Sequence, residues 1–194
     1  MGPTAEKRKF TYADYKSWPD EERWEIIDGE AYNMTPAPGL RHQAVSMNLS
    51  RIFANYFFGK PYRLFSAPTD VILDDFNIVQ PDLLVVCDPN KLTEANIQGA
   101  PDLVVEILSP STKLKDKREK KALYERFGVR EYLIVYPEDE MVEQYRLVDG
   151  RYVTDVFNWD QKLPLFAFPD LELQLWDVFE KGMAEIQIRT EVKP

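Results

Sequence analysis

Cysteine and histidine are nearly absent from this 194-residue chain, which contains one of each, Cys87 and His42. A single cysteine cannot form a disulfide within the chain, and Cys87 lies in an apolar run, as expected of a small core residue in a reducing compartment. His42 has no second histidine and no nearby cysteine. The sequence therefore excludes a zinc site of ordinary composition.

Long hydrophobic runs and several well-known motifs are also missing. No apolar run approaches membrane-spanning length, and residues 1–9 lack the apolar segment of a signal peptide. We therefore expect a cytoplasmic protein that does not bind membranes. No G-x-G-x-x-G or phosphate-loop motif supports nucleotide binding, and Ser109 and Ser111 lack the G-x-S-x-G context of a serine hydrolase.

Positive charge is outnumbered, with 24 Lys and Arg residues against 33 Asp and Glu residues and a net charge of −9. This balance excludes nonspecific wrapping of nucleic acid around the whole surface. It leaves room for a local basic patch, such as the cationic stretch from Lys113 to Lys121. An acidic balance also suits chemistry that needs carboxylates to hold a metal ion.

The periodicity of apolar residues predicts a mixed α/β order along the chain. Helical spacing and end signals predict helices over 12–18, 40–58 and 112–127. Alternating or continuous apolar runs predict strands over 62–66, 70–73, 78–87, 102–108, 131–136, 163–168 and 171–179. Asp28-Gly29 and Asp149-Gly150 predict the turns of two hairpins, within 23–34 and within 141–157. One mixed sheet flanked by helices is the natural architecture for this order.

Glu106 is an acid in the middle of an expected buried strand, where it is costly unless something pairs or binds it. Asp82 follows Pro81 in a neighbouring strand candidate, so the two carboxylates could share a Mg²⁺ or Mn²⁺ ion. Asp102 lies four residues from Glu106, about 13 Å along the same strand, which is too far for one shared metal. The alternatives are a turn or cap role for Asp82, and an ion pair between Glu106 and a helix lysine.

The helix after Glu106 contributes a lysine. Leu123, Tyr124 and Phe127 define its buried stripe, and helical spacing extends that stripe back through Lys120 and Asp116. Lys120 beside Glu106 could orient a water molecule or stabilise charge on a phosphate. The alternative is a Lys120–Asp116 pair on a partly solvated face.

Glu25 adds a third acid, in Trp24-Glu25-Ile26-Ile27. Strand alternation places Glu25 on one face together with Ile27, so it could join the metal site. A surface position for Glu25 is equally compatible with the pattern.

Several segments together resemble a bacterial family of putative restriction endonucleases, formerly of unknown function, in the PD-(D/E)XK restriction-endonuclease-like superfamily. The most specific is Val105-Glu-Ile-Leu-Ser-Pro-Ser-Thr112. The others are Trp24-Glu-Ile-Ile-Asp-Gly-Glu30, Gln80-Pro-Asp82, Asp116-x-x-x-Lys120-x-x-x-Tyr124 and Gly128-Val-Arg-Glu-Tyr132. The resemblance implies an α/β restriction-endonuclease-like fold, with a mixed central β-sheet flanked by helices and additional β-hairpins. It further implies a single domain over residues 10–180, with tails at 1–9 and 181–194.

The resemblance also implies roles for residues. The superfamily aspartate falls on Asp82 and the glutamate of the E-x-K motif on Glu106. We expect these two carboxylates to hold the metal, with the Ile107 carbonyl as a further candidate ligand. Leu108 occupies the usual lysine position, and Lys120 is the helix position that matches the displaced lysine, with Lys117 as the alternative. Glu25 matches an extra acid of the family.

We therefore expect a Mg²⁺- or Mn²⁺-dependent endonuclease that hydrolyses phosphodiester bonds, with DNA as the expected partner. A homodimer is compatible with this expectation, because enzymes that cut both strands often pair two sites by two-fold symmetry. The alternative is a catalytically inactive module on the nuclease fold that binds nucleic acid or a protein partner. The acidic net charge and Leu108 support that alternative.

Overall fold

The centre of the molecule is a six-stranded sheet with the strand order β11-β10-β9-β8-β6-β3. A computed structural model describes residues 8–19, 21–34, 38–108 and 115–182, with side chains for all of these except 115–118. Strands β8 and β9 are parallel and the other neighbours are antiparallel, so the sheet is mixed. Its strands are β3 (Arg63–Ser66), β6 (Leu83–Val86), β8 (Leu103–Ile107), β9 (Glu131–Tyr136), β10 (Met141–Val148) and β11 (Arg151–Asn158).

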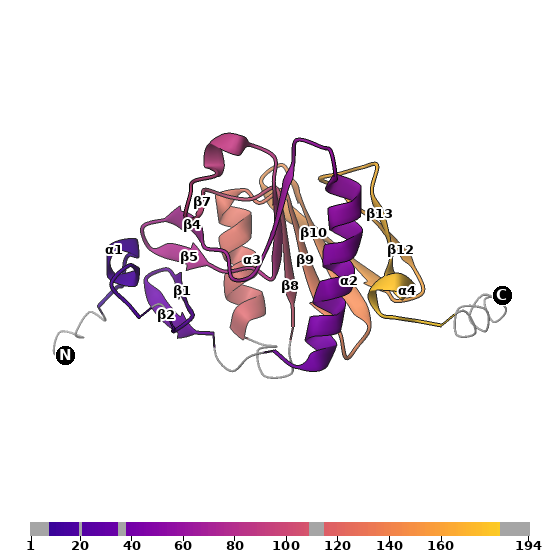
Figure 1. Ribbon diagram of the computed structural model, residues 1–194, viewed down its shortest axis with the longest axis horizontal. Helices are drawn as coiled ribbons and strands as arrows, with labels where there is room; N and C mark the ends of the chain where they lie inside the picture. Colours follow the sequence, from indigo (N-terminus) through magenta and orange to yellow (C-terminus); the bar gives the residue numbers. More distant parts are fainter. Residues whose placement is uncertain (1–7, 20, 35–37, 109–114, 183–194) are drawn as a thin grey trace.

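A second sheet of five strands, in the order β2-β1-β5-β4-β7, lies beside the central sheet (Figure 1). Helix α1 (Tyr12–Tyr15) precedes it in the chain, and the short 3₁₀ helix η1 (Pro89–Lys91) lies between β6 and β7. A third sheet pairs β12 (Lys162–Pro164) with β13 (Glu172–Gln174). The strands of the second sheet are β1 (Trp24–Ile27), β2 (Glu30–Asn33), β4 (Val71–Asp74), β5 (Asn77–Val79) and β7 (Ile97–Gln98).

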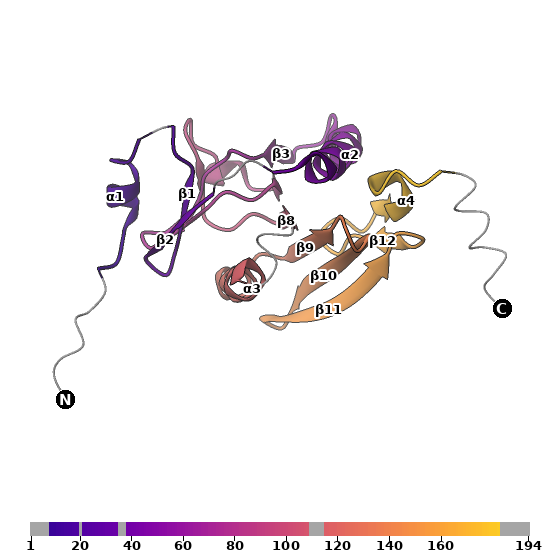
Figure 2. The same ribbon diagram turned by 90° about the horizontal axis from the view of Figure 1, so that it is seen from below.

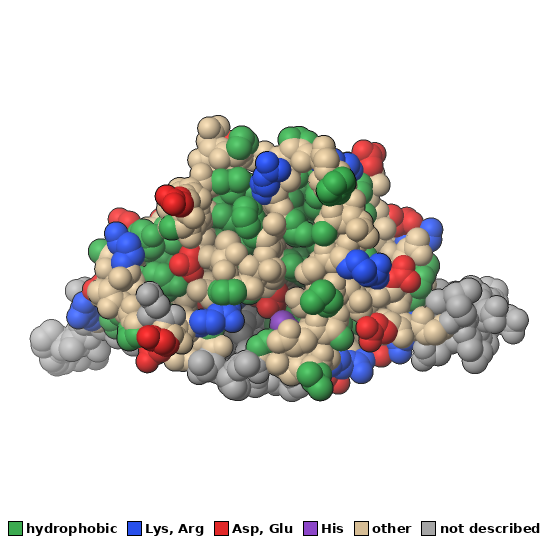
Figure 3. Space-filling view, in the orientation of Figure 1, with side chains coloured by type: hydrophobic (Ala, Val, Ile, Leu, Met, Phe, Trp, Pro, Cys, Tyr) green, Lys and Arg blue, Asp and Glu red, His purple; other side chains and the backbone are tan. Residues whose placement is uncertain are grey.

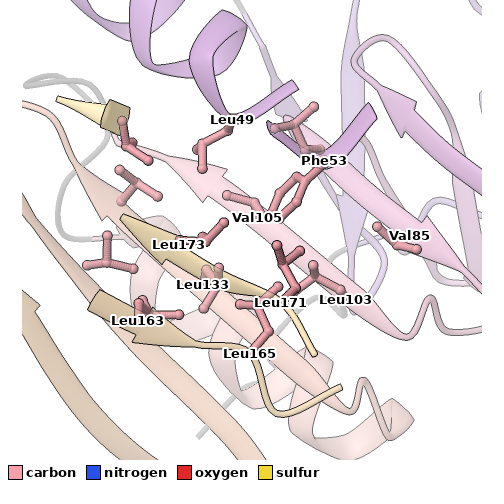
Figure 4. Packing of buried hydrophobic residues seen from close by; sticks show 14 of the residues in the cluster. Leu49, Phe53, Val85, Leu103, Val105, Leu133, Leu163, Leu165, Leu171 and Leu173 are labelled. Carbon is pink, nitrogen blue, oxygen red and sulfur yellow. The ribbon is translucent and has the colours of Figure 1, made fainter. Parts of the chain in front are cut away.

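Two helices lie on opposite sides of the central sheet (Figure 2). Helix α2 (Leu40–Phe57) contributes the apolar stripe Val45, Leu49, Phe53 and Phe57, spaced at helical intervals. This stripe packs on leucines and valines of β6, β8 and β9, together with β12, β13 and the short helix α4 (Leu175–Val178), as Figure 4 shows. Helix α3 (Lys115–Phe127) lies on the other side, where Leu123 and Tyr124 pack against the opposite sheet face.

The expected fold class and both hairpins are confirmed. In β1-β2 and in β10-β11, the two turn residues have positive φ, 52° at Asp28 and 82° at Gly29, then 49° at Asp149 and 75° at Gly150. Turns of this type match the twist of the flanking strands, and they favour Asp-Gly because glycine adopts positive φ without a steric penalty.

The expectation of one central strand over 78–87 was wrong. The chain forms β5 in the five-stranded sheet, leaves it at Gln80-Pro81-Asp82, and enters the six-stranded sheet as β6. Proline cannot donate a ladder hydrogen bond, so a continuous strand is broken at Pro81. This break forms the connection between the two sheets and places Asp82 at the start of β6.

Other boundaries also differ from the expected ones. The strand expected over 171–179 ends at Gln174, and α4 follows it. The strand expected over 163–168 ends at Pro164, and α1 ends at Tyr15 rather than at 18. Residues 112–114 of the expected third helix lie outside the described residues, and α3 is described from Lys115. Among the described residues, no helix is both long enough and apolar enough to cross a membrane.

Candidate active site

Glu106 lies in β8, where all five strand residues are buried. It shares a sheet face with Val104 and Leu108, the face that α3 covers. Its Oε1 atom accepts hydrogen bonds from Lys120 Nζ and from the Tyr124 hydroxyl, each at 2.9 Å. The buried acid that the sequence singled out is therefore paired by two side chains from one helix, spaced four residues apart.

Lys120 joins the two sheets through a buried ion-pair cluster. Its Nζ atom lies 2.9 Å from Glu106 Oε1 and 2.9 Å from Glu25 Oε1, and its side chain is 4% exposed. Glu25 comes from β1, in the other sheet, and its Oε1 also accepts the backbone N–H of Gln80 at 2.8 Å. Helix α3 contacts both β1 and β9, which explains how one lysine reaches acids from both sheets.

Asp82 lies next to Glu106 because of the strand register. Strands β6 and β8 are antiparallel, with Leu83 opposite Val105, so the residue before Leu83 falls opposite Glu106. Asp82 Oδ2 accepts the amide N–H of Ile107 at 2.7 Å, and the Asp82 side chain is 22% exposed. The site therefore opens to solvent on the Asp82 side, whereas Lys120 forms its buried end.

His42 also lies at this site, although its sequence context predicted no role for it. Its Nε2 atom lies 3.3 Å from Asp82 Oδ2. Its Nδ1 atom is buried without a hydrogen-bond partner among the described residues. His42 lies three residues before Val45, at the start of the buried stripe of α2. Helical spacing, applied to the histidine as it was to Lys120, would have placed it against the sheet.

Two oxygen atoms of the cluster remain open to a hard cation. The described hydrogen bonds and ion pairs use Oε1 of Glu106 and Oδ2 of Asp82, and none of them uses Glu106 Oε2 or Asp82 Oδ1. No group of three or more Asp, Glu, His or Cys side chains suited to a metal ion occurs within the described part of the chain. Mg²⁺ commonly takes only one or two carboxylates and completes its shell with water and substrate phosphate. The donor set therefore fits a magnesium-type site and not an all-protein cage.

The electrostatics of the cluster are set mainly by burial. Burial raises the pKa of Glu106 to about 8, Lys120 opposes that shift, and the charges of Glu25 and Asp82 add to it. The pKa of Lys120 is raised because Glu106 and Glu25 together outweigh the opposing effect of burial. Burial and the neighbouring Glu106 raise the pKa of Tyr124 as well. At neutral pH the lysine is therefore charged, the tyrosine is neutral, and Glu106 holds a proton that a cation would displace.

This proton gives a prediction for stability. Glu106 binds its proton up to about pH 8 in the folded protein, but only up to about pH 4.5 in the unfolded chain. Between these values the folded state holds more protons, so the free energy of unfolding falls as pH rises. We expect Glu106→Gln to remove this decline, and urea unfolding of both proteins from pH 5 to pH 9 would measure it. Parallel curves for the two proteins would contradict the assignment.

Glu131 shows how a purely structural buried acid differs from Glu106. Its side chain accepts the backbone N–H groups of Phe166 and Ala167 and the side-chain amide of Gln144. It is fully buried, and these neutral donors come from the segments that it holds in place. Glu106 instead belongs to a cluster of three acids and one lysine, with solvent access at one end.

The structure decides some of the alternatives left open by the sequence. Glu25 is 2% exposed and Lys120 is 3% exposed, so neither lies on a solvated face. The Glu106 ion pair with a helix lysine is present, and Leu108 is a buried core residue. The Asp116 side chain lies outside the described residues.

The basic stretch of α3 is only partly described. Lys113 and the side chains of Lys115, Lys117 and Arg118 lie outside the described residues. Lys121 is described, and its Nζ atom lies 4.5 Å from the centre of the Tyr145 ring. On the face seen in Figure 3, the described Lys and Arg side chains are scattered among acidic ones and do not gather in a stripe.

Comparisons with known proteins agree with this fold and with the sequence resemblance. The family model "Uma2: Putative restriction endonuclease" matches residues 12–176. A solved structure from Anabaena variabilis, described as a putative nuclease belonging to DUF820, superimposes with a TM-score of 0.75 at 22% identity. The match covers 88% of this chain and 98% of that chain, which shows a shared fold.

Two cyanobacterial relatives from Synechocystis sp. are similar along most of their length. The uncharacterized protein slr1290 is 30% identical over 151 residues, which cover 76% of this chain and 79% of the relative. The uncharacterized protein sll1609 is 29% identical over 158 residues, which cover 78% of this chain and 88% of the relative. The family model spans most of the chain and the resemblance of the motifs is confirmed. The chain therefore belongs to the Uma2 family of putative restriction endonucleases.

Proposed function

We propose that the protein is a metal-dependent endonuclease that hydrolyses phosphodiester bonds of DNA at the cluster of Asp82, Glu106, Lys120 and Glu25. The observation that carries the proposal is the meeting of Asp82 and Glu106 across paired strands, beside a buried lysine. A protein core gains little from three acids and one lysine, because desolvation cancels most of their attraction. Such a costly cluster is typical of a functional site.

Asp82 and Glu106 would hold Mg²⁺ or Mn²⁺ through Asp82 Oδ1 and Glu106 Oε2, with the Ile107 carbonyl as a further ligand. The bound metal supplies a water of lowered pKa and neutralises phosphate charge. The Ile107 amide and His42 hold the other oxygen of Asp82, so its carboxylate is oriented before a cation arrives.

Lys120 acts as a hydrogen-bond donor and a fixed positive charge. Its raised pKa keeps it protonated, so it cannot take the proton of the attacking water. An ammonium group has three donors, and Glu25 and Glu106 accept two of them. The third is available for the attacking water or for a phosphate oxygen, whose charge increases as the water oxygen bonds to phosphorus. Glu25 positions this lysine from the far side.

We expect substrate to approach from the Asp82 side of the cluster. The Asp82 side chain is 22% exposed, whereas the Lys120 side chain is only 4% exposed. The sequence has a basic stretch from Lys113 to Lys121 after Glu106, and basic residues of this kind commonly contact phosphates. The net charge of −9 opposes binding elsewhere on the surface, so cleavage is expected to fall steeply with added salt.

Metal binding tests the proposal without relying on activity. We expect isothermal titration calorimetry to detect Mn²⁺ binding, with proton release that is larger at pH 7 than at pH 9, because Glu106 must lose its proton. Asp82→Asn should weaken binding at least about 10-fold.

Asp102→Asn is the matched control for this titration. Asp102 also follows a proline at the start of a buried strand, and its Oδ2 accepts the Cys87 amide at 2.8 Å. It lies at the other end of β8, so its amide variant should bind Mn²⁺ like the parent protein. Equal binding by the Asp82 and Asp102 variants would contradict the proposed ligand set.

A further inference from the structure

The outer face of α2 has an unusual row of exposed apolar side chains. Leu40 and Met47 of α2 are 90% and 69% exposed, and Phe58, the C-cap residue directly after α2, is 90% exposed. In Figure 3 hydrophobic side chains are visible at intervals along the exposed side of α2. Single exposed apolar residues are normal, but three on one face of one helix are more often part of an interface.

These residues follow a regular spacing. The positions 40, 44, 47, 51, 54 and 58 are separated by alternating steps of four and three, which keeps them on one side of the helix. We call them the α2 stripe: Leu40, Ala44, Met47, Arg51, Ala54 and Phe58. Alternating steps of four and three are typical of a helix that packs along its length against another helix.

The α2 stripe is also symmetric about residue 49. Reversing the helix places Leu40 opposite Phe58, and it places Ala44 opposite Ala54. The remaining pair is Met47 with Arg51. Large side chains therefore meet at the two ends and at the centre, around the two-fold axis, and the alanine pairs between them let the helices approach closely. This is the pattern that an antiparallel pair of identical helices needs, because a two-fold axis pairs each residue i with a residue j and j with i.

A pocket that could take the ring of Phe58 lies at the N-terminal end of α2, the end away from Phe58. A pocket of about 270 Å³ between α2 and α4 is lined by residues that include Leu40, Ala44, Val178 and Phe179. Phe58 lies 18 residues from Leu40, about 27 Å along the helix axis, and so cannot reach this pocket in its own chain. In the antiparallel pair, Phe58 of a second copy lies opposite Leu40, at the mouth of the pocket.

Charge supports the same pairing. Arg51 has no ion pair within the described part of the chain. Glu180 lies beside α2, where its Oε1 accepts the Asn48 side-chain amide at 3.1 Å. In the antiparallel pair, Arg51 of the second copy lies opposite Met47 of the first, within reach of Glu180 of the first copy. The two-fold axis would then form two such Arg51–Glu180 pairs.

We propose that two copies of the chain form a two-fold symmetric dimer through antiparallel packing of the α2 stripes. Each Phe58 fills the pocket beside Leu40 of the other copy, and Arg51 pairs with Glu180. The proposal is independent of the proposed nuclease activity. A single pair of helices buries less area than a standard interface, so we expect micromolar dissociation.

Sedimentation velocity from about 1 μM to about 500 μM tests the proposal. We expect a shift from monomer to dimer for the parent protein and a monomer throughout for Phe58→Glu. Val156→Glu is the matched control, because Val156 is 53% exposed on β11, and it should dimerise like the parent. A parent protein that stays monomeric, or a Phe58→Glu variant that still dimerises, would overturn the proposal.

Cysteine cross-linking tests the antiparallel register. In a Cys87→Ser background, Ala44→Cys and Ala54→Cys variants are oxidised separately and as a mixture. Position 44 of one copy lies opposite position 54 of the other, whereas two copies of either position are about 15 Å apart. We expect the mixture to form disulfide-linked dimers much faster than either variant alone. Equal rates would overturn the register.

Discussion

Replacing Lys120 with methionine is expected to destabilise the protein by about 3–5 kcal/mol at pH 8 to 9. Methionine keeps the length and most of the packing of the side chain but removes its charge. Glu25 and Glu106 would then remain buried without the cation that lies 2.9 Å from each of them. An unpaired buried charge costs far more than the net value of the pair that was lost.

The loss should be smaller near pH 6. The parent Glu106 already holds a proton there, because its pKa is raised to about 8. Removing the lysine at pH 6 therefore leaves a buried neutral acid at position 106, and not an unpaired buried carboxylate. Urea unfolding of Lys120→Met at both pH values measures the effect. Lys121→Met is the control, because this neighbouring lysine is partly exposed and lies over the Tyr145 ring, without a buried carboxylate among its described contacts, and its loss should cost about 1 kcal/mol. Similar losses for the two variants would contradict the buried cluster.

The second large effect is on catalysis. Glu106→Gln is expected to reduce phosphodiester cleavage by about 100- to 1,000-fold while leaving a folded protein. Glutamine has the shape of glutamate and can still accept hydrogen bonds from Lys120 and Tyr124, so the local packing is kept. It cannot supply a negative oxygen to a metal ion, so the water would lose its activation.

Two comparisons separate this loss from a loss of folding. The variant should unfold at a urea concentration equal to or above that of the parent at pH 8, because glutamine avoids the cost of burying a carboxylate. Glu131→Gln changes another buried acid, which accepts hydrogen bonds from the backbone N–H groups of Phe166 and Ala167. It should lower stability with little change in cleavage at temperatures where the protein is folded. Cleavage by Glu106→Gln at the parent rate would remove Glu106 from the mechanism.

The fold was predictable wherever a local pattern determined it. Strong short-range signals mark the Asp-Gly turns, the buried apolar residues of α2 from Val45 to Phe57, and the buried runs of β8 and β9. The division of β5 and β6 between the five-stranded and the six-stranded sheet carries no such signal. It depends on where Pro81 interrupts an otherwise continuous apolar run, and a proline within a run is compatible with a strand start, a bulge or a change of sheet.

The candidate site shows the same limit. Burial cost and helical spacing placed Glu106 and Lys120 together, and both are buried in contact with each other. The participation of Glu25 was left open, because contact between β1 and α3 is a long-range event that alternation cannot predict. His42 was missed because its chemistry was considered without its position on the helix. Its contact with Asp82 depends on how α2 crosses the end of β6.

The most direct test of the nuclease assignment is cleavage of a supercoiled plasmid by the purified protein with Mg²⁺ or Mn²⁺. Parent protein, Asp82→Asn and Asp102→Asn are compared with and without a chelator. We expect metal-dependent nicking or linearisation by the parent and by Asp102→Asn, and a loss of at least about 100-fold in Asp82→Asn. A parent protein that binds DNA without cutting it in either metal, or an Asp82→Asn variant that cuts as well as the parent, would contradict a metal-dependent nuclease site at Asp82. The first of these results would favour an inactive nucleic-acid-binding module on the same fold.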